Sequence, residues 1–203
     1  MIGGSWTHLL ARPMVRALLG TWVRPNHLTT LRVLTGLAAC LGFALGTRAG
    51  MNWGGALWLV SAFLDRADGE LARIGNMMSP AGHLYDYYAD VVINAVFFVA
   101  IGFGLRDSWF GDWAILLGVI SGASLLLASV FAEWLERRSP PGTRAIVGKW
   151  GFDPDDALYL MTPLAWLDWL NPVLLGASIA TPVITIVTGL RLLRLRRALP
   201  HHA

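Results

Sequence analysis

Residues 65–90, DRADGELARIGNMMSPAGHLYDYYAD, place four aspartates in a strongly apolar chain and decide how it folds. Asp65 and Asp68 are three positions apart, and Asp86 and Asp90 are four apart. In an α-helix, either spacing puts both members of a pair on one face. The stretch therefore predicts two consecutive helices whose acidic faces meet.

The apolar runs on either side of this stretch indicate how deep the carboxylates lie in a membrane. Residues 51–64 and 91–105 are apolar. At ~1.5 Å per residue they span about 21 and 22 Å of a hydrocarbon core roughly 30 Å thick. A tight turn at Gly75 and Asn76 would therefore bring both pairs to one level. Each carboxylate at the bilayer centre costs about 2.5 to 3.5 kcal/mol on insertion scales, so we expect bound cations to compensate.

The composition predicts an all-α integral membrane protein. The chain has 203 residues, of which 55% are hydrophobic and 14% charged. A soluble catalytic domain of ordinary size, roughly 100 residues, does not fit beside the apolar segments. We therefore expect a single membrane domain over residues 1–203 to carry the chemistry. The lone Cys40 excludes an intrachain disulfide.

The apolar segments predict six transmembrane helices after a short N-terminal interfacial helix. Residues 1–24 mix apolar and basic side chains and lack the features of a signal peptide, which favours a retained surface helix that breaks or restarts at Pro13. Residues 25–195 form the six-helix bundle, and residues 196–203 form a basic tail. The expected transmembrane helices cover residues 28–46, 51–74, 80–105, 112–136, 155–170 and 172–194.

The basic residues predict the orientation of these helices. Only Arg48 and Arg106 lie at one end of the bundle. At the other end lie Arg12, Arg16, Arg24, Arg32, Arg73, Arg137, Arg138, Arg144, Lys149, Arg191, Arg194, Arg196 and Arg197. By the positive-inside rule, both termini and the four aspartates face the cytoplasm from the inner membrane. The basic balance therefore requires no nucleic-acid partner, and we see no RNA or DNA motif.

The aspartate stretch closely resembles the signature of the CDP-alcohol phosphotransferases (CDP-alcohol phosphatidyltransferases), integral membrane enzymes that make phospholipid head-group linkages. That family carries D-x-x-D-G-x-x-A-R, eight residues, and then G-x-x-x-D-x-x-x-D. The fixed positions here are Asp65, Asp68, Gly69, Ala72, Arg73, Gly82, Asp86 and Asp90. The expected layout of six helices extends the likeness to the whole chain. The resemblance implies a homodimer that transfers a phosphatidyl group from a CDP-linked lipid, such as CDP-diacylglycerol, to an acceptor alcohol and releases CMP.

The four carboxylates suit Mg²⁺ or Mn²⁺, because both ions accept oxygen ligands and the sequence has no Cys or His cluster with zinc spacing. Their charge offsets two divalent ions, as in two-metal sites. The resemblance assigns Asp65, Asp68 and Asp86 to metal binding. It implies that Asp90 binds the second ion and acts as general base on the acceptor hydroxyl.

The resemblance also implies a site for the nucleotide of the donor. Arg73 offers a forked, permanent charge to a phosphate, and the small residues of the motif leave room for a planar cytosine. The segment P-N-x-L-T-x-x-R at residues 25–32 resembles a family segment near the nucleotide, although Thr29 or Thr30 can equally cap a helix. Ser79 before Pro80 is also a standard helix start. The donor-site candidates are Asn26, Thr29, Gly69, Ala72, Arg73, Ser79 and Gly82.

The acceptor is not identified by the sequence. Basic side chains between the fourth and fifth expected membrane helices can bind an acceptor phosphate, or can serve only as topology signals. These are Arg137, Arg138, Arg144 and Lys149. Acidic residues at 153–156 can instead favour an amine-bearing alcohol or cap the fifth helix.

Three other interpretations of the four aspartates stay open. They can form structural ion pairs with Arg66 and Arg73, although two arginines do not balance four acids. They can mark the pathway of an intramembrane cation-coupled transporter. They can also belong to a Mg²⁺-dependent prenyltransferase, whose motifs are differently spaced. Elsewhere, Gly118 and Gly122 form a small-xxx-small pair that allows a close helix contact, within the chain or in a dimer.

Overall fold

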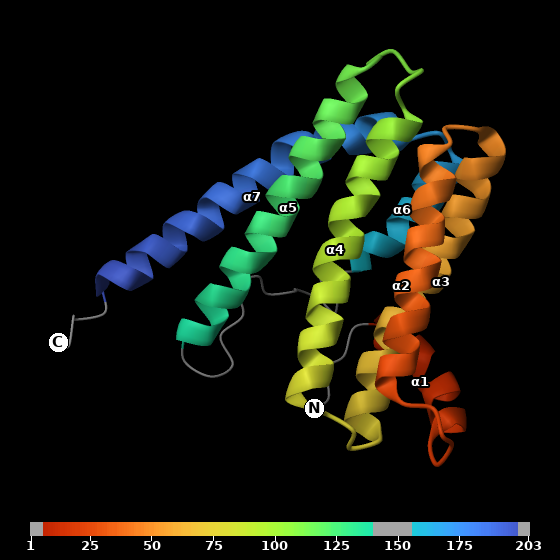
Figure 1. Cartoon of the computed structure of the whole chain (residues 1–203), viewed down its shortest axis with the longest axis vertical. Coiled ribbons are helices and arrows are strands. Elements are labelled where there is room, and N and C mark those ends of the chain that lie inside the picture. Colours follow the sequence, from red (N-terminus) through yellow and green to blue (C-terminus); the bar gives the residue numbers. More distant parts are fainter. Residues whose placement is uncertain (1–5, 140–155, 199–203) are drawn as a thin grey trace.

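The computed structural model describes residues 6–139 and 156–198, and every regular element in them is an α-helix (Figure 1). The predicted all-α class is therefore confirmed for this part of the chain. The helices are α1 (Trp6–Leu18), α2 (Pro25–Ala44), α3 (Arg48–Ile74), α4 (Pro80–Gly104), α5 (Trp113–Arg138), α6 (Ala157–Trp166) and α7 (Leu170–Ala198).

Four of these helices are long and apolar enough to cross a membrane, namely α2, α4, α5 and residues 170–195 of α7. The helix α6 is apolar but has only 10 residues. The helix α3 has sufficient length, at 27 residues, but its second half carries the charged residues of the aspartate motif. Length and composition thus support four of the six predicted crossings.

The start of α2 differs from the prediction in a way that bears on function. The helix begins at Pro25, whose missing N–H is not needed in a first turn, and not at residue 28. The side chain of His27 accepts a hydrogen bond from the Arg24 backbone N–H at 3.1 Å. Thr29 and Thr30 lie inside the helix, so the prediction that either caps it is wrong. Likewise α1 continues through Pro13 without the predicted break.

The break between α6 and α7 lies at residues 167–169 rather than at residue 171. Asp168 adopts a left-handed conformation with φ 59°, and the Trp169 N–H donates to the Leu164 carbonyl at 2.8 Å. This pattern satisfies carbonyls at the end of α6. The proline at position 172 then falls in the first turn of α7, where a proline is tolerated.

The core of the bundle combines aromatic stacking with close helix contacts at glycines. The rings of Trp58 and Phe97 stack with centroids 4.0 Å apart and join α3 to α4. A Cβ on Gly54 of α3 would lie 3.1 Å from the Ala39 carbonyl oxygen of α2. A Cβ on Gly118 of α5 would lie 2.5 Å from the carbonyl oxygen of Phe98 in α4. Glycine therefore sets the approach of both helix pairs.

The helix α1 packs against α3, directly behind the aspartate motif. Ala11 and Val15 of α1 are fully buried in a cluster with Leu64, Ala67 and Leu71 of α3. In Figure 1, α1 lies beside the lower parts of α2 and α3, away from α5 and α7. The amphipathic N-terminal segment therefore uses its apolar face to cover the helix that carries Asp65 and Asp68.

A buried polar network reinforces this contact between the N-terminal segment and the motif helix. The Thr7 hydroxyl donates to the Asp156 carboxylate at 2.8 Å, and the Arg66 guanidinium lies 3.6 Å from the same carboxylate. All three residues are buried. Asp156 directly precedes α6. Its carboxylate therefore connects α1, α3 and the start of α6, and it helps to fix the position of α3 relative to the other two helices.

Candidate active site

A tight turn joins the two motif helices at the predicted place. The helix α3 ends at Ile74, and Asn76 adopts a left-handed conformation with φ 51°, which asparagine tolerates better than most residues. The Met77 N–H donates to the Ala72 carbonyl at 2.9 Å. Ser79 then caps α4, accepting a hydrogen bond from the Gly82 N–H at 3.0 Å.

The turn brings three of the four aspartates into one cluster. Carboxylate oxygens of Asp65, Asp68 and Asp86 all lie within 4.8 Å of one another. Asp68 is 2% exposed, while Asp65 and Asp86 are partly buried. Three converging carboxylates form an oxygen-only ligand set that suits a hard divalent cation.

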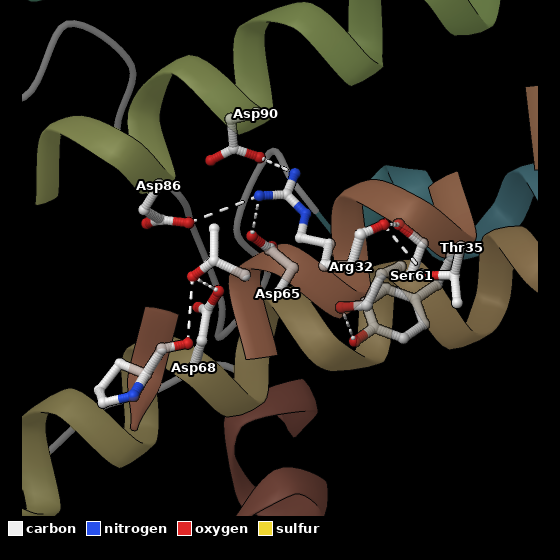
Figure 2. Close-up of polar contacts among 11 residues, drawn as sticks. Arg32, Thr35, Ser61, Asp65, Asp68, Asp86 and Asp90 are labelled. Atoms are coloured by element: carbon white, nitrogen blue, oxygen red, sulfur yellow. Dashed lines mark hydrogen bonds and ion pairs between the residues drawn. The ribbon is translucent and has the colours of Figure 1, made fainter. Parts of the chain in front are cut away.

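The fourth aspartate, Asp90, pairs with an arginine of α2. The guanidinium of Arg32 lies between the two motif helices, as Figure 2 shows. Its Nη1 is 3.0 Å from an Asp65 oxygen and 3.5 Å from an Asp86 oxygen, and its Nη2 contacts Asp90. Arg32 is 2% exposed. One buried cation thus contacts three of the four acids.

Sequence reasoning missed this role of Arg32, which it counted as an orientation signal and as the end of a segment near the nucleotide. The available signal was the segment at residues 25–32, in which Arg32 is the last fixed position. The arginines considered as structural partners lie elsewhere. The Arg73 guanidinium is 3.5 Å from a Glu70 oxygen, and Arg66 lies beside Asp156 as described above.

Thr29 also contacts the cluster. Its hydroxyl donates to the Asp68 carboxylate at 2.7 Å, and both side chains are buried. The next threonine, Thr30, instead bonds to the Asn26 carbonyl and lies 3.0 Å from the Tyr85 hydroxyl. The two threonines of the segment thus differ, because only Thr29 faces α3.

A cavity of about 450 Å³ opens beside the carboxylate cluster. Asp68 and Asp86 line it together with residues from α2, α3, the turn and α4. Each donor-site candidate lies along this cavity, namely Asn26, Thr29, Gly69, Ala72, Arg73, Ser79 and Gly82. Met77, Met78 and His83 complete part of the wall, so the cavity has a mostly apolar lining with a few charged groups.

The two motif glycines differ in what surrounds them. A Cβ on Gly69 would meet only the end of the Arg73 side chain, at 3.4 Å. A Cβ on Gly82 would lie 2.9 Å from the Ser79 hydroxyl and 3.3 Å from the Asn26 amide oxygen. The packing of the described residues therefore explains a small residue at position 82, whereas at position 69 a Cβ would make only an ordinary van der Waals contact with Arg73.

The candidates for the acceptor site are only partly described. Arg137 pairs with Glu133 at 2.6 Å, one helical turn earlier on α5, and the Arg138 guanidinium lies 5.9 Å from the centroid of the Trp134 ring. Arg144 and Lys149 lie outside the described residues. Gly118 and Gly122 face α4 within the chain, since a Cβ on either would lie 2.5 Å from an α4 carbonyl oxygen.

Solved structures with the same fold include two of one enzyme. The crystal structure of Mycobacterium tuberculosis phosphatidylinositol phosphate synthase with CDP-DAG bound has a TM-score of 0.70 and 18% identity, over 94% of this chain and 95% of its own. The structure of that synthase with manganese and citrate has a TM-score of 0.69 and 18% identity, over 94% and 90%. Identities this low show a shared fold. No curated protein sequence matches the chain.

The family model described as CDP-alcohol phosphatidyltransferase matches residues 22–190, which contain α2 to α6 and most of α7. This range includes the carboxylate cluster, Arg32 and the cavity beside them. The chain therefore belongs to the CDP-alcohol phosphatidyltransferase family, and it is a multi-pass integral membrane enzyme of phospholipid synthesis.

Proposed function

We propose that the chain transfers a phosphatidyl group from CDP-diacylglycerol to the hydroxyl of an acceptor alcohol, with release of CMP. The observation that carries this proposal is the position of the cavity. It lies beside the carboxylate cluster and is lined by all seven donor-site candidates. The CDP-DAG in the mycobacterial synthase agrees with this choice of donor.

The donor nucleotide would occupy the cavity between α2, α3 and α4. Arg73, whose side chain is half exposed, would bind a phosphate through its guanidinium. The part of the cavity lined by Gly69 and Ala72 would accept the cytosine, because neither residue has a bulky side chain. The exposed methionine at position 78 also lines the cavity, whose apolar side chains would contact the glycerol-linked part of the donor.

Two divalent ions, Mg²⁺ or Mn²⁺, would bind at the carboxylate cluster. The ligand set fits, because Asp65, Asp68 and Asp86 bring only oxygen atoms within 4.8 Å of one another. Asp90 would complete the second site. When bound, such ions neutralise the pyrophosphate and stabilise the attacking and leaving oxygens. The manganese in the mycobacterial synthase is consistent with a divalent ion here.

Asp90 and Arg73 would have separate roles in the reaction. Asp90 accepts the proton of the acceptor hydroxyl, and the alcohol oxygen forms a bond to the phosphorus that carries the lipid. The bond between that phosphorus and the bridging oxygen breaks, and the bridging oxygen leaves with CMP. Arg73 holds the nucleotide phosphate throughout, which keeps the reacting atoms aligned.

The helices α2 to α7 would cross the membrane six times in a single domain. The short α6 and the charged α3 would be shielded by their neighbours, since their buried residues include Thr162, Arg66, Asp68 and Glu70. Both termini and the aspartate cluster would face the cytoplasm, in keeping with the basic residues at that end. The family also implies a homodimer.

The acceptor phosphate or alcohol would approach from the cytoplasmic end of α5. Arg137 and Arg138 are the described candidates there, and Arg144 and Lys149 belong to the segment that follows. Four cations within a short stretch favour a phosphorylated acceptor. A glycerol phosphate or an inositol phosphate has the required hydroxyl and charge.

The test is an assay of CMP release by the purified protein. CDP-diacylglycerol and Mg²⁺ are supplied with one acceptor at a time, drawn from phosphorylated polyols, free polyols and amino alcohols. We expect CMP to appear with one phosphorylated acceptor and a new phospholipid to form in equal amount. Diphosphate release from a prenyl diphosphate, without CMP release from the CDP-lipid, would contradict the proposal.

A further inference from the structure

The buried arginine of α2 separates the four aspartates into two groups. Asp65, Asp68 and Asp86 form the cluster of converging oxygens, and Asp90 is held by Nη2 of Arg32. We propose that Arg32 is a positioning residue, an internal counter-cation that lowers the affinity of the cluster for divalent ions and holds Asp90 toward the acceptor side. The role assigned to Asp90 rests on the proposed function, whereas the effect on ion affinity does not.

The backbone at Arg32 is fixed in place on α3 and α4. Its carbonyl oxygen accepts a hydrogen bond from the Ser61 hydroxyl of α3 at 3.0 Å. One turn later, a Cβ on Gly36 would lie 2.9 Å from the Ile93 side chain of α4 and 3.0 Å from the Ser61 hydroxyl. Because α2 packs this closely against both motif helices, these contacts fix the position from which the Arg32 side chain extends to the acids.

The guanidinium matches its partners in shape as well as charge. Nη1 is directed at Asp65 and Asp86, while Nη2 is directed at Asp90. A planar fork can donate in two directions at once, whereas a lysine ammonium acts as a compact point charge. Substitution by lysine should therefore preserve the charge at this place while weakening the hold on Asp90.

The electrostatic consequence has a definite sign. Asp65 and Asp86 are expected ion ligands, so a fixed positive charge in contact with them opposes a second cation. Without an ion, that same charge is what compensates acids buried in a membrane domain. Removal of the arginine should therefore tighten ion binding and at the same time destabilise the ion-free protein. If Arg32 had only a general structural role, its removal would lower both the ion affinity and the stability of the ion-free protein.

The test uses the full chain in detergent, titrated with Mn²⁺ alone and followed by electron paramagnetic resonance of the free ion. We expect Arg32→Gln to bind Mn²⁺ on the order of tenfold more tightly than the natural chain. In EDTA, Arg32→Gln should unfold at a lower temperature, and Mn²⁺ should narrow that difference. Mn²⁺ affinity in Arg32→Gln that is unchanged or weaker overturns the proposal.

Arg32→Lys tests the positioning of Asp90 separately. We expect near-natural Mn²⁺ affinity, a lowered kcat for CMP release and little change in KM for CDP-diacylglycerol. A natural kcat in Arg32→Lys overturns the positioning role. If Arg32→Gln folds only in the presence of Mn²⁺, competition with EDTA measures its affinity, and Arg32→Lys still tests Asp90.

Arg48→Gln is the matched control, because Arg48 pairs with Asp168 at 2.5 Å among exposed residues far along α3 from the cluster. It should leave Mn²⁺ affinity and CMP release unchanged. If the natural chain binds Mn²⁺ but releases no CMP with any acceptor, the proposed function fails. The comparison of Mn²⁺ affinities still decides the role of Arg32.

Discussion

Thr29 donates a hydrogen bond of 2.7 Å to the Asp68 carboxylate, from a position 39 residues earlier in the chain. Both side chains are 2% exposed. The bond crosses from α2 to α3 and fixes the orientation of one carboxylate in the cluster. A hydroxyl in this place acts as an outer partner of an ion ligand, and such partners commonly contribute strongly to ion affinity.

We therefore expect Thr29→Val to weaken Mn²⁺ binding by about 10 to 100-fold, because Asp68 loses the donor that orients it. Titration of the purified protein with Mn²⁺ measures the change. Thr35→Val is the matched control, since its hydroxyl bonds to the Leu31 and Arg32 carbonyls of its own helix. Equal losses in both variants would contradict a specific role for Thr29.

The position of Gly69 in the cavity wall yields a prediction about donor binding. Gly69→Leu should fold normally, because a Cβ there meets only the flexible end of Arg73, but the added side chain should obstruct the nucleotide. Thermal-shift measurements with CDP-diacylglycerol should show a lost response. Gly176→Leu, at an open position in α7, should respond like the natural chain. Undiminished nucleotide affinity in Gly69→Leu would mean that the donor lies elsewhere.

Asp90→Asn should behave in the opposite way. We expect measurable CDP-diacylglycerol binding with a loss of CMP release of ~10² to 10⁴-fold or more, because the asparagine cannot accept the proton. Binding and single-turnover measurements on the same preparation separate the two effects. A loss of donor binding equal to the loss of turnover would argue against Asp90 as the base.

The carboxylate cluster predicts an absolute need for a divalent ion. EDTA should abolish CMP release, and Mg²⁺ or Mn²⁺ should restore it. Asp65→Asn and Asp86→Asn should remain inactive after the ion is restored, while each still elutes as a folded, monodisperse protein. Full activity in EDTA would contradict the two-ion proposal.

The orientation can be tested with single cysteines on a Cys40→Ser background. Met78→Cys lies in the turn of the motif, and Asp107→Cys lies in the loop between α4 and α5; both native side chains are exposed. In intact cells, an impermeant maleimide should label position 107 but not position 78. Labelling of position 78 from outside would reverse the proposed topology.

The sequence predicted the acidic part of the site well because helical periodicity and turn chemistry are local. The spacing of the aspartates and the turn at Gly75 and Asn76 predicted that all four acids meet, and three of them, Asp65, Asp68 and Asp86, form the cluster. The role of Arg32 could not be predicted in this way. Its contact with Asp90 spans 58 positions and depends on how closely α2 approaches α4, which is decided by packing at Gly36 and Ser61.

The helix ends were harder to predict than the helices themselves. Thr29 and Thr30 both have side chains that can cap a helix, but Pro25 starts the helix one turn earlier, so Thr29 can contact Asp68 instead.

The pair Gly118 and Gly122 had two possible interpretations from sequence alone, since small residues suit contacts within a chain and between chains. Only the position of α4 identified the contact within the chain.

The burial of α3 on several sides has a consequence for how the protein enters the membrane. Its charged half is covered by α1, by Arg32 of α2 and by the residue before α6, so its polar groups meet protein rather than lipid. A segment of this kind is costly to release into the bilayer by itself. We therefore expect α3 to partition into lipid together with α2, as a helical hairpin in which Arg32 already pairs with Asp65, before the later helices emerge.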